Sequence, residues 1–150
     1  MNIHWQWFTL DTFDTRTLLA YLRLRQDIFV VEQKCTAPEI DDYDPPAQHL
    51  VGRDKQGRVI AALRLVPPGL KFPEPSLGRV VVHPDSRRGG TGSALLREAL
   101  AKSDALWPGQ GNRISAQSHL QHFYGNVGFK TVSEEYEEDG LPHVEMWRES

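Results

Sequence analysis

Three consecutive valines followed by a proline and a glycine-rich turn limit the possible folds of this chain more than any other feature. Val80, Val81 and Val82 form the continuous β-branched run that is typical of a strand covered on both faces. Pro84 ends this strand because proline lacks the N–H group that a continuing strand needs. The glycine-rich turn R-R-G-G-T-G at 87–92 comes next, and leucines and alanines then recur at helical spacing. The order strand, glycine-rich turn, helix predicts an α/β fold with this strand at its centre.

The remaining chain alternates between the apolar spacing of strands and that of helices. The expected elements are, in order, an edge strand at 3–7, a helix capped by Asp14 or Thr15 and running to about 29, strands at 49–53 and 59–66 joined by a turn at 54–57, the central strand at 77–83, a helix at 93–103, a short strand at 113–116, a helix at 119–127, and strands at 130–134 and 143–147. Prolines and aspartates predict an ordered acidic loop at 32–48. We therefore expect an α/β (α+β) fold in which helices flank a mixed central sheet of about six to seven strands.

Composition favours a single domain over residues 1–150 and excludes several functional classes. Hydrophobic residues make up 39% and charged residues 25%, which is ordinary for a folded protein. The net charge of -3 argues against nucleic acid as a partner, because nucleic-acid-binding domains are usually basic. No apolar run is long enough to span a membrane. Cys35 has no second cysteine to pair with, so we expect no disulfide, no metal site and a reducing, cytoplasmic environment.

The glycine-rich turn has the properties of an anion-binding site. Small residues expose successive backbone N–H groups where the helix amino terminus also favours negative charge, and Arg87 and Arg88 add formal positive charge. A pyrophosphate, with its several acceptor oxygens, suits such a turn. Gly92 is followed by Ser93 and Ala94, which excludes a Walker A loop, and the G-x-G-x-x-G dinucleotide pattern is missing. Taken alone, the motif leaves open a turn that merely connects strand and helix.

Two motifs in this order resemble the signatures of the GNAT N-acetyltransferase family. Arg87, Gly90 and Gly92 match the family's R/Q-x-x-G-x-G/A motif, which follows a V-V-V-H-P strand end. Further along, A-Q-S-H-L-Q-H-F-Y-G-N-V-G-F at 116–129 is similar to the second signature, a strand end, a helix carrying F-Y and a G-F turn. The similarity extends to the ElaA-type branch of the family. Its patterns L-R-x-x-V-F-V-V-E-Q and D-G-x-P-H-x-E-M resemble residues in the ranges 24–33 and 139–146.

This resemblance implies the GNAT fold, in which the central pair of strands splays apart, and acetyl-CoA as the cofactor. The backbone of Val80 and Val82 would pair with the pantetheine arm, and N–H groups near Val81 or Val82 would stabilise the oxyanion. The residues that the resemblance assigns to the pyrophosphate cradle are Arg87, Arg88, Gly89, Gly90, Thr91, Gly92 and Ser93. Gln117 stands where most relatives have Asn, which puts that side-chain contact in doubt. Tyr124 matches the general acid that protonates the departing thiolate, and packing of an aromatic pair on the sheet is its alternative role.

The general base is harder to assign from the sequence. Residues 77–82 contain no acidic side chain, whereas many members of the family place a Glu on this strand. Three candidates remain open: Glu32, directly after the first helix, and the pair His143 and Glu145, whose i, i+2 spacing places both on one face of the last strand. His119, near the cofactor end of the second signature, is a further alternative.

The expected activity is therefore transfer of an acetyl group from acetyl-CoA to a primary amine of a small molecule or a peptide. Asp41, Asp42 and Asp44 in the acidic loop favour a cationic acceptor. Two alternatives stay open. One is an acyl-CoA-binding regulatory module without turnover, which the missing strand Glu favours; the other is an acyltransferase with another acyl donor, since V-F-V-V-E-Q also resembles acyl-homoserine-lactone synthases. The aromatic edge around Trp5 and Trp7 either covers its own sheet or packs against a second copy in a homodimer.

Overall fold

Two four-stranded antiparallel sheets form the framework of the computed structural model, which describes residues 2–150. The first sheet has the strand order β1-β2-β3-β4, and the second has the order β5-β8-β6 with β7 also paired to β8. The strands are β1 (His4–Phe8), β2 (Gln48–Arg53), β3 (Val59–Val66), β4 (Ser76–Val82), β5 (Asn112–Gln117), β6 (Lys130–Thr131), β7 (Tyr136–Glu138) and β8 (Leu141–Arg148). The expected α/β (α+β) fold is confirmed, but its strands form two antiparallel sheets and not one mixed central sheet. The described chain has eight strands, more than the expected six to seven, because two short strands, β6 and β7, replace the single strand expected at 130–134.

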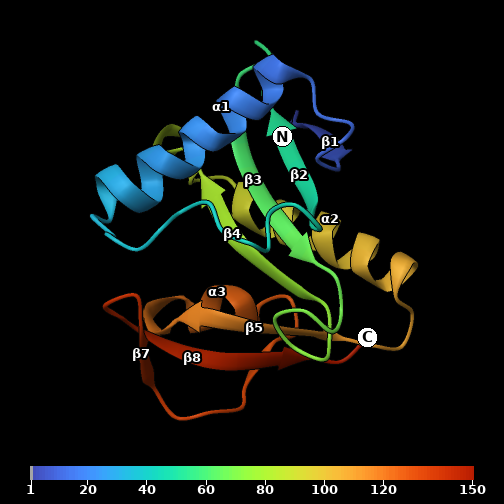
Figure 1. Cartoon of the computed structure of the whole chain (residues 1–150), viewed down its shortest axis with the longest axis vertical. Helices are drawn as coiled ribbons and strands as arrows, with labels where there is room; N and C mark the ends of the chain where they lie inside the picture. Colours follow the sequence, from blue (N-terminus) through green and yellow to red (C-terminus); the bar gives the residue numbers. More distant parts are fainter. Residues whose placement is uncertain (1) are drawn as a thin grey trace.

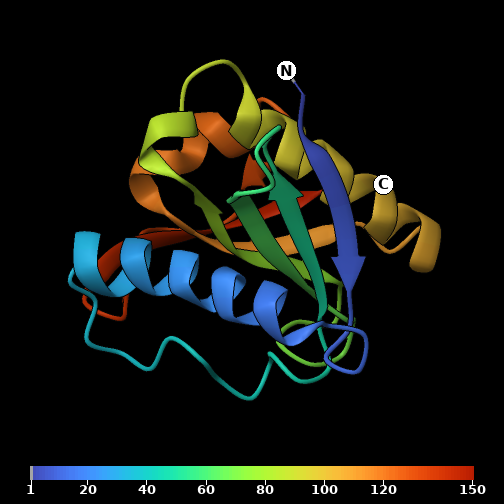
Figure 2. The same cartoon turned by 90° about the horizontal axis from the view of Figure 1, so that it is seen from above.

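Helices cover both faces of the first sheet (Figure 1 and Figure 2). α1 (Thr15–Arg25) begins at Asp14, whose Oδ2 accepts a hydrogen bond from the backbone N–H of Thr17 at 3.0 Å. It continues as a π-helical segment, η1 (Gln26–Glu32), so that helical structure passes the expected end near residue 29. The other helical elements are the turn η2 (Pro84–Ser86), α2 (Thr91–Leu106), the turn η3 (Ser118–Leu120) and α3 (Gln121–Gly125). Within residues 2–150, no helix is long and apolar enough to cross a membrane.

The alternation of side chains along β3 explains why both faces of this sheet are covered. Leu63 and Leu65 belong to the hydrophobic cluster that α2 shares with both sheets, whereas Ala62 belongs to a second cluster beneath α1. Trp5 and Trp7 are partly buried and pack against the larger cluster. The aromatic edge of β1 therefore covers its own sheet.

β4 and β5 meet at their starts and then diverge (Figure 1). The backbone N–H of Arg113 donates to the carbonyl oxygen of Pro75 at 3.0 Å, and the N–H of Leu77 donates to Oδ1 of Asn112 at 3.1 Å. Beyond these contacts the two strands belong to separate sheets. The arrangement is the splayed strand pair that the sequence resemblance implied.

A bulge in β4 lies where the two sheets separate. The register against β3 shifts there, and Arg79 has a φ of 49°, in the left-handed region. Val81 is buried under α1, but Val80 and Val82 are only half-buried. Val80 and Val82 nevertheless pack against the larger cluster, so both faces of the strand are covered as expected, the second face only in part.

Candidate active site

A pocket opens between the diverging strands, and it collects residues from distant parts of the chain. Its lining includes Val80 from β4, Gln117 from β5, Tyr124 from α3 and His143 from β8. The π-helical segment η1 and the loop after it close another side of the pocket. The structure therefore brings together four of the residues that the sequence analysis assigned to cofactor binding or catalysis.

The glycine-rich turn next to this pocket fits a pyrophosphate. Gly89 and Gly90 have φ values of 88° and 83°, a backbone conformation that side chains with a Cβ rarely adopt. Gly90 is the N-cap of α2, yet no side chain caps the helix and its first turn contains no acidic residue. A Cβ on Gly92 would lie 2.8 Å from Cε1 of Phe123, so this position also needs glycine for helix packing. The turn thus offers an open, uncapped helix amino terminus to an anionic group.

Arg87 holds this cradle against the π-helical segment. Its two terminal nitrogens each donate to a carboxylate oxygen of Glu32 at 2.8 Å, and its Nε donates to the carbonyl oxygen of Val82 at 3.1 Å. The hydrogen bond from Arg87 is the main cause that lowers the pKa of Glu32. Glu32 is exposed and does not line the pocket. In this arrangement it acts as a counter-ion of the cradle.

Tyr124 presents an unpartnered hydroxyl at the pocket. The side chain is 6% exposed, and its ring packs edge-to-face on Phe123 and Phe129 with centroid distances of 5.1 and 5.9 Å. Its hydroxyl makes no hydrogen bond to any residue in the range 2–150. Burial raises the pKa of Tyr124, so the phenol keeps its proton at neutral pH.

His143 and Glu138 form a dyad on the opposite wall. His143 is 7% exposed, and its Nδ1 lies 2.8 Å from the carbonyl oxygen of Leu141, to which it donates its proton. The other ring nitrogen, Nε2, then carries a lone pair and lies 3.5 Å from Oε2 of Glu138. Ser115 Oγ donates to Oε1 of the same carboxylate at 3.1 Å. Nε2 of His143 can accept a proton, and Glu138 stabilises the resulting positive charge.

Glu138 was not among the residues predicted from the sequence. It lies in the run of acidic residues that precedes the turn at 139–140, and such runs usually face solvent. Its only signal was its position, directly before D-G-x-P-H. In the antiparallel pairing of β7 with β8, Glu138 lies opposite Leu141 and therefore diagonally across from His143.

The other candidates for the base lie elsewhere. Glu145 shares a face of β8 with His143, but its Oε1 accepts a hydrogen bond from Nη1 of Arg113 at 2.9 Å, and it does not line the pocket. His119 is exposed and also lies outside the pocket lining. Gln117 does reach the pocket, where its Nε2 donates to Oε1 of Gln33 at 3.1 Å. This contact links β5 to the end of the π-helical segment.

The acidic loop is held by three arginines. Nη1 and Nη2 of Arg25, which is 0% exposed, lie 2.8 and 3.0 Å from the carboxylate oxygens of Asp44. The six charged members of this network are Arg25, Arg64, Arg79, Glu39, Asp41 and Asp44, so its formal charges cancel. Burial raises the pKa of Asp44, but the hydrogen bonds and positive charge of Arg25 outweigh it and hold the value at about 2. The loop therefore has little negative charge left to attract a cationic acceptor, because Asp41 and Asp44 are already paired.

Comparisons with known proteins agree with this geometry. The family model of the acetyltransferase (GNAT) domain matches residues 29–150. Protein ElaA of Escherichia coli is 36% identical over 149 residues, which cover 98% of this chain and 97% of ElaA. The crystal structure of Escherichia coli ElaA superposes with a TM-score of 0.90 at 34% identity, covering 98% of this chain and 99% of that one. An acyl-CoA N-acyltransferase from Pseudomonas aeruginosa gives the same TM-score and the same coverage at 37% identity. This chain is therefore a member of the GNAT acetyltransferase family, in its ElaA-type branch.

Proposed function

We propose that this protein transfers an acetyl group from acetyl-CoA to a primary amine. The observation that carries the proposal is the pairing, in one pocket, of a protonated phenol without a partner and an imidazole nitrogen with a lone pair. Tyr124 supplies the first and His143 the second. Bound acetyl-CoA supplies a thioester, whose carbonyl carbon bonds to the amine nitrogen as its bond to sulfur breaks.

The cradle and β4 would bind and orient the cofactor. The backbone N–H groups at the start of α2 would bind the pyrophosphate, and Gly89 and Gly90 would allow its close approach. Val80 and Val82 lie on a strand without a ladder partner on the β5 side, so their backbone would pair with the pantetheine amides. The same backbone would place an N–H group near the reacting carbonyl, where it stabilises developing negative charge.

His143 is our choice for the general base. Its Nε2 would take a proton from the ammonium form of the acceptor or from the attacking nitrogen. The Nδ1 hydrogen bond to Leu141 fixes the ring orientation, and the Glu138 carboxylate lies close enough to stabilise the protonated ring. This assignment replaces the strand carboxylate that many family members use.

Tyr124 is our choice for the general acid. Its hydroxyl proton would pass to the departing thiolate, and residues 2–150 supply no competing hydrogen-bond acceptor for it. A thiol has an ordinary pKa of about 8.5, so the thiolate needs only modest assistance to leave. The proton that leaves at Tyr124 would be regained from solvent after product release.

Release of free thiol from acetyl-CoA over a panel of primary amines tests the proposal, with propionyl-CoA as a second donor. A His143→Gln variant should lose at least about 100-fold in kcat, which is the lower end of the usual contribution of a general base. Glu145→Gln is the matched control because it lies on the same face of β8 but outside the pocket, and it should retain turnover. Binding of acetyl-CoA without turnover on every amine would instead support a regulatory acyl-CoA-binding module.

A further inference from the structure

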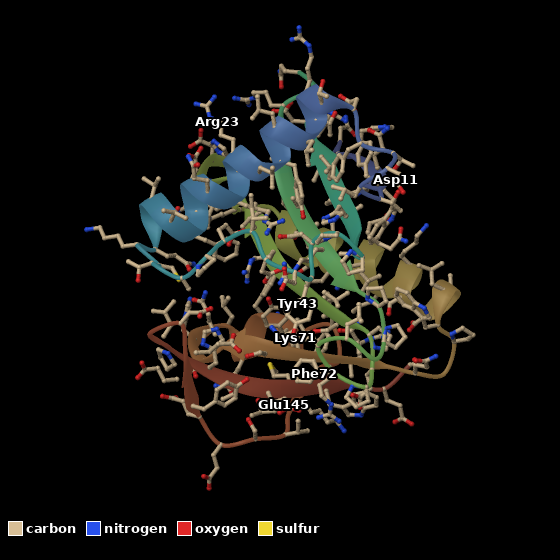
Figure 3. The ribbon with its side chains drawn as sticks, in the orientation of Figure 1. Asp11, Arg23, Tyr43, Lys71, Phe72 and Glu145 are labelled. Carbon is tan, nitrogen blue, oxygen red and sulfur yellow. The ribbon has the colours of Figure 1, made fainter. Side chains whose placement is uncertain are left out.

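Lys71 is a positive charge without a partner in the pocket that holds Tyr124 and His143. It lies in the loop between β3 and β4 and is half-buried at the boundary of the two sheets (Figure 3). Its ammonium group forms no hydrogen bond and no ion pair with residues 2–150. Burial lowers the pKa of Lys71, and the charge of Glu138 opposes this effect without forming an ion pair.

The other cations of the pocket lining are already neutralised. Arg64 is paired with Asp41, and Arg79 is paired with Glu39. A buried or half-buried ammonium group without a counter-ion loses hydration free energy that no protein contact returns. An anionic group on a ligand would offset this loss of hydration free energy. Lys71 is therefore the cation of this lining that still lacks a counter-ion.

The remaining charges of the lining restrict the negative charge that this anion can carry. Glu39 is paired with Arg25 and Arg79, but Glu138 and Asp139 also line the pocket, so a doubly charged phosphate would meet two acidic residues and one free ammonium group. A carboxylate, with a single negative charge, matches Lys71 alone. At the other wall, His143 and Glu138 are suited to an amine.

We infer that the acyl acceptor is a small molecule that carries a carboxylate as well as its amine, such as an amino acid, and that Lys71 binds the carboxylate. The inference rests on the proposed function and adds the class of substrate to it. Lys71 would hold the acid end of the acceptor while the amine end reaches Nε2 of His143. The acceptor is then a zwitterion and not the purely cationic amine that the acidic loop suggested.

Matched sets of three compounds test this inference: an amino acid, its carboxamide, and the amine that remains after its decarboxylation. The wild-type protein should use the amino acid with a kcat/KM about 10- to 100-fold above that of the other two, which is the usual range for a hydrogen bond to a charged group. Lys71→Met should remove this preference, mainly by raising KM for the amino acid, and should not lower kcat/KM for the two compounds that lack a carboxylate. Lys71→Arg should keep most of the preference because it keeps the charge.

Lys55→Met is the matched control, since Lys55 is exposed on the turn between β2 and β3 and lies outside the pocket lining. Thermal denaturation of Lys71→Met should show equal or higher stability, because the variant loses no hydrogen bond or ion pair within residues 2–150 and removes an ammonium group that has no counter-ion. Turnover of the decarboxylated amine as fast as that of the amino acid would overturn the inference and leave the proposed function standing. Absence of thiol release with every compound would overturn the proposed function. Calorimetric binding of the amino acids then decides the inference, which fails if their Kd is the same in Lys71→Met.

Discussion

Tyr124 combines a closely packed ring with a hydroxyl that has no partner within residues 2–150. Replacement by phenylalanine therefore tests the role of the hydroxyl in catalysis while the packing of the ring is kept. In Tyr124→Phe we expect kcat to fall by about 10- to 100-fold, at or below the low end of a general acid's usual contribution, because a thiolate leaves readily. The melting temperature should stay about the same, since the variant keeps the packed ring and removes a hydroxyl that makes no hydrogen bond within residues 2–150. Thiol-release kinetics and thermal denaturation measure the two effects, and unchanged kcat would contradict the acid assignment.

Asp44 links the stability of the fold to pH. Its pKa is held at about 2 in the folded protein, below the ordinary value of 3.8, so its ion pairs stabilise the folded state above pH 4 and are lost as the pH falls toward 2. The shift corresponds to about 2 kcal/mol. We expect the free energy of unfolding, measured in urea, to decrease from pH 4 to pH 2 in the wild-type protein. Asp44→Asn should be less stable at pH 7 by about 3 kcal/mol, because it leaves Arg25 without a full charge partner, and should show a flatter decrease.

Asp42→Asn is the control for this experiment because Asp42 is exposed and lies two residues away in the same loop. It should keep both the stability and the acid dependence of the wild-type protein. Equal acid dependence in Asp44→Asn would show that other carboxylates set the acid limit of the fold.

The buried arginines show what the sequence leaves hidden at the scale of residues. Arg25 falls at a core-facing position of the expected first helix, where its charge contradicts the apolar spacing. Its partners Glu39 and Asp44 come from the loop that follows, and Arg64 and Arg79 join from two other strands. No local pattern links these positions, because burial of a charge depends on partners that only the folded chain brings within reach.

The amino terminus of α2 is the element on which the proposed binding of acetyl-CoA depends. In Gly90→Glu, a side chain with negative charge would occupy the space of the pyrophosphate at a φ of 83°. We expect the Kd for acetyl-CoA, measured by calorimetry, to rise at least about 10-fold, which corresponds to about 1.4 kcal/mol. Strain at a positive φ would also lower stability by about 1 kcal/mol.

Gly109→Glu separates these two effects. Gly109 has a φ of 77° and open space around it, and it lies beyond the opposite end of α2. The control should lose similar stability and keep the Kd of the wild-type protein. An unchanged Kd in Gly90→Glu would contradict the assignment of the glycine-rich turn to cofactor binding.

Elements with strong local patterns were predicted well, and those shaped by contacts across the fold were not. The spacing of apolar residues located α1, α2 and the hairpin of β2 and β3 because each buries one face against a neighbour. The bulge at Arg79 follows no local rule. Its guanidinium lies 3.0 Å from Oε1 of Glu39 and 3.2 Å from Oδ2 of Asp41, so the acidic loop holds this part of β4 in place. Short strands such as β6 form only by pairing with β8, so their bounds were not predicted from the local sequence.

At the scale of the whole molecule, the active site exists because two sheets share a core at one end and separate at the other. The dyad of His143 and Glu138 belongs to the second sheet, whereas the cradle follows the last strand of the first. The sequence motifs, through the family resemblance, indicated the splayed strands. They did not show which acidic side chain would face His143 or that Lys71 would lie in the same pocket, because those contacts join separate sheets and loops.

Asn112 holds the two sheets together at the closed end. It is fully buried, its Oδ1 accepts the hydrogen bond from Leu77 N, and its Nδ2 lies 3.4 Å from Oγ of Ser103 in α2. Asn112→Ala would leave the N–H of Leu77 buried without an acceptor. We expect the free energy of unfolding, measured in urea, to fall by about 1 to 3 kcal/mol, the usual penalty for such a group.

Acetyl-CoA should offset this loss, because its pantetheine arm would bridge the open end of the same two sheets. A ligand present at 100 times its Kd stabilises a folded protein by about 2.7 kcal/mol, so the melting temperature of Asn112→Ala should return close to that of the ligand-free wild-type protein. Asn126→Ala, at the exposed end of α3, is the control and should melt as the wild-type protein does with and without ligand. Acetyl-CoA could instead stabilise the wild-type protein but not Asn112→Ala, with each protein at the same ratio of ligand concentration to Kd. That result would mean that the variant first unfolds in a region that does not contact the cofactor. The two sheets would then unfold as separate units, which the shared core of α2, β3 and β5 argues against.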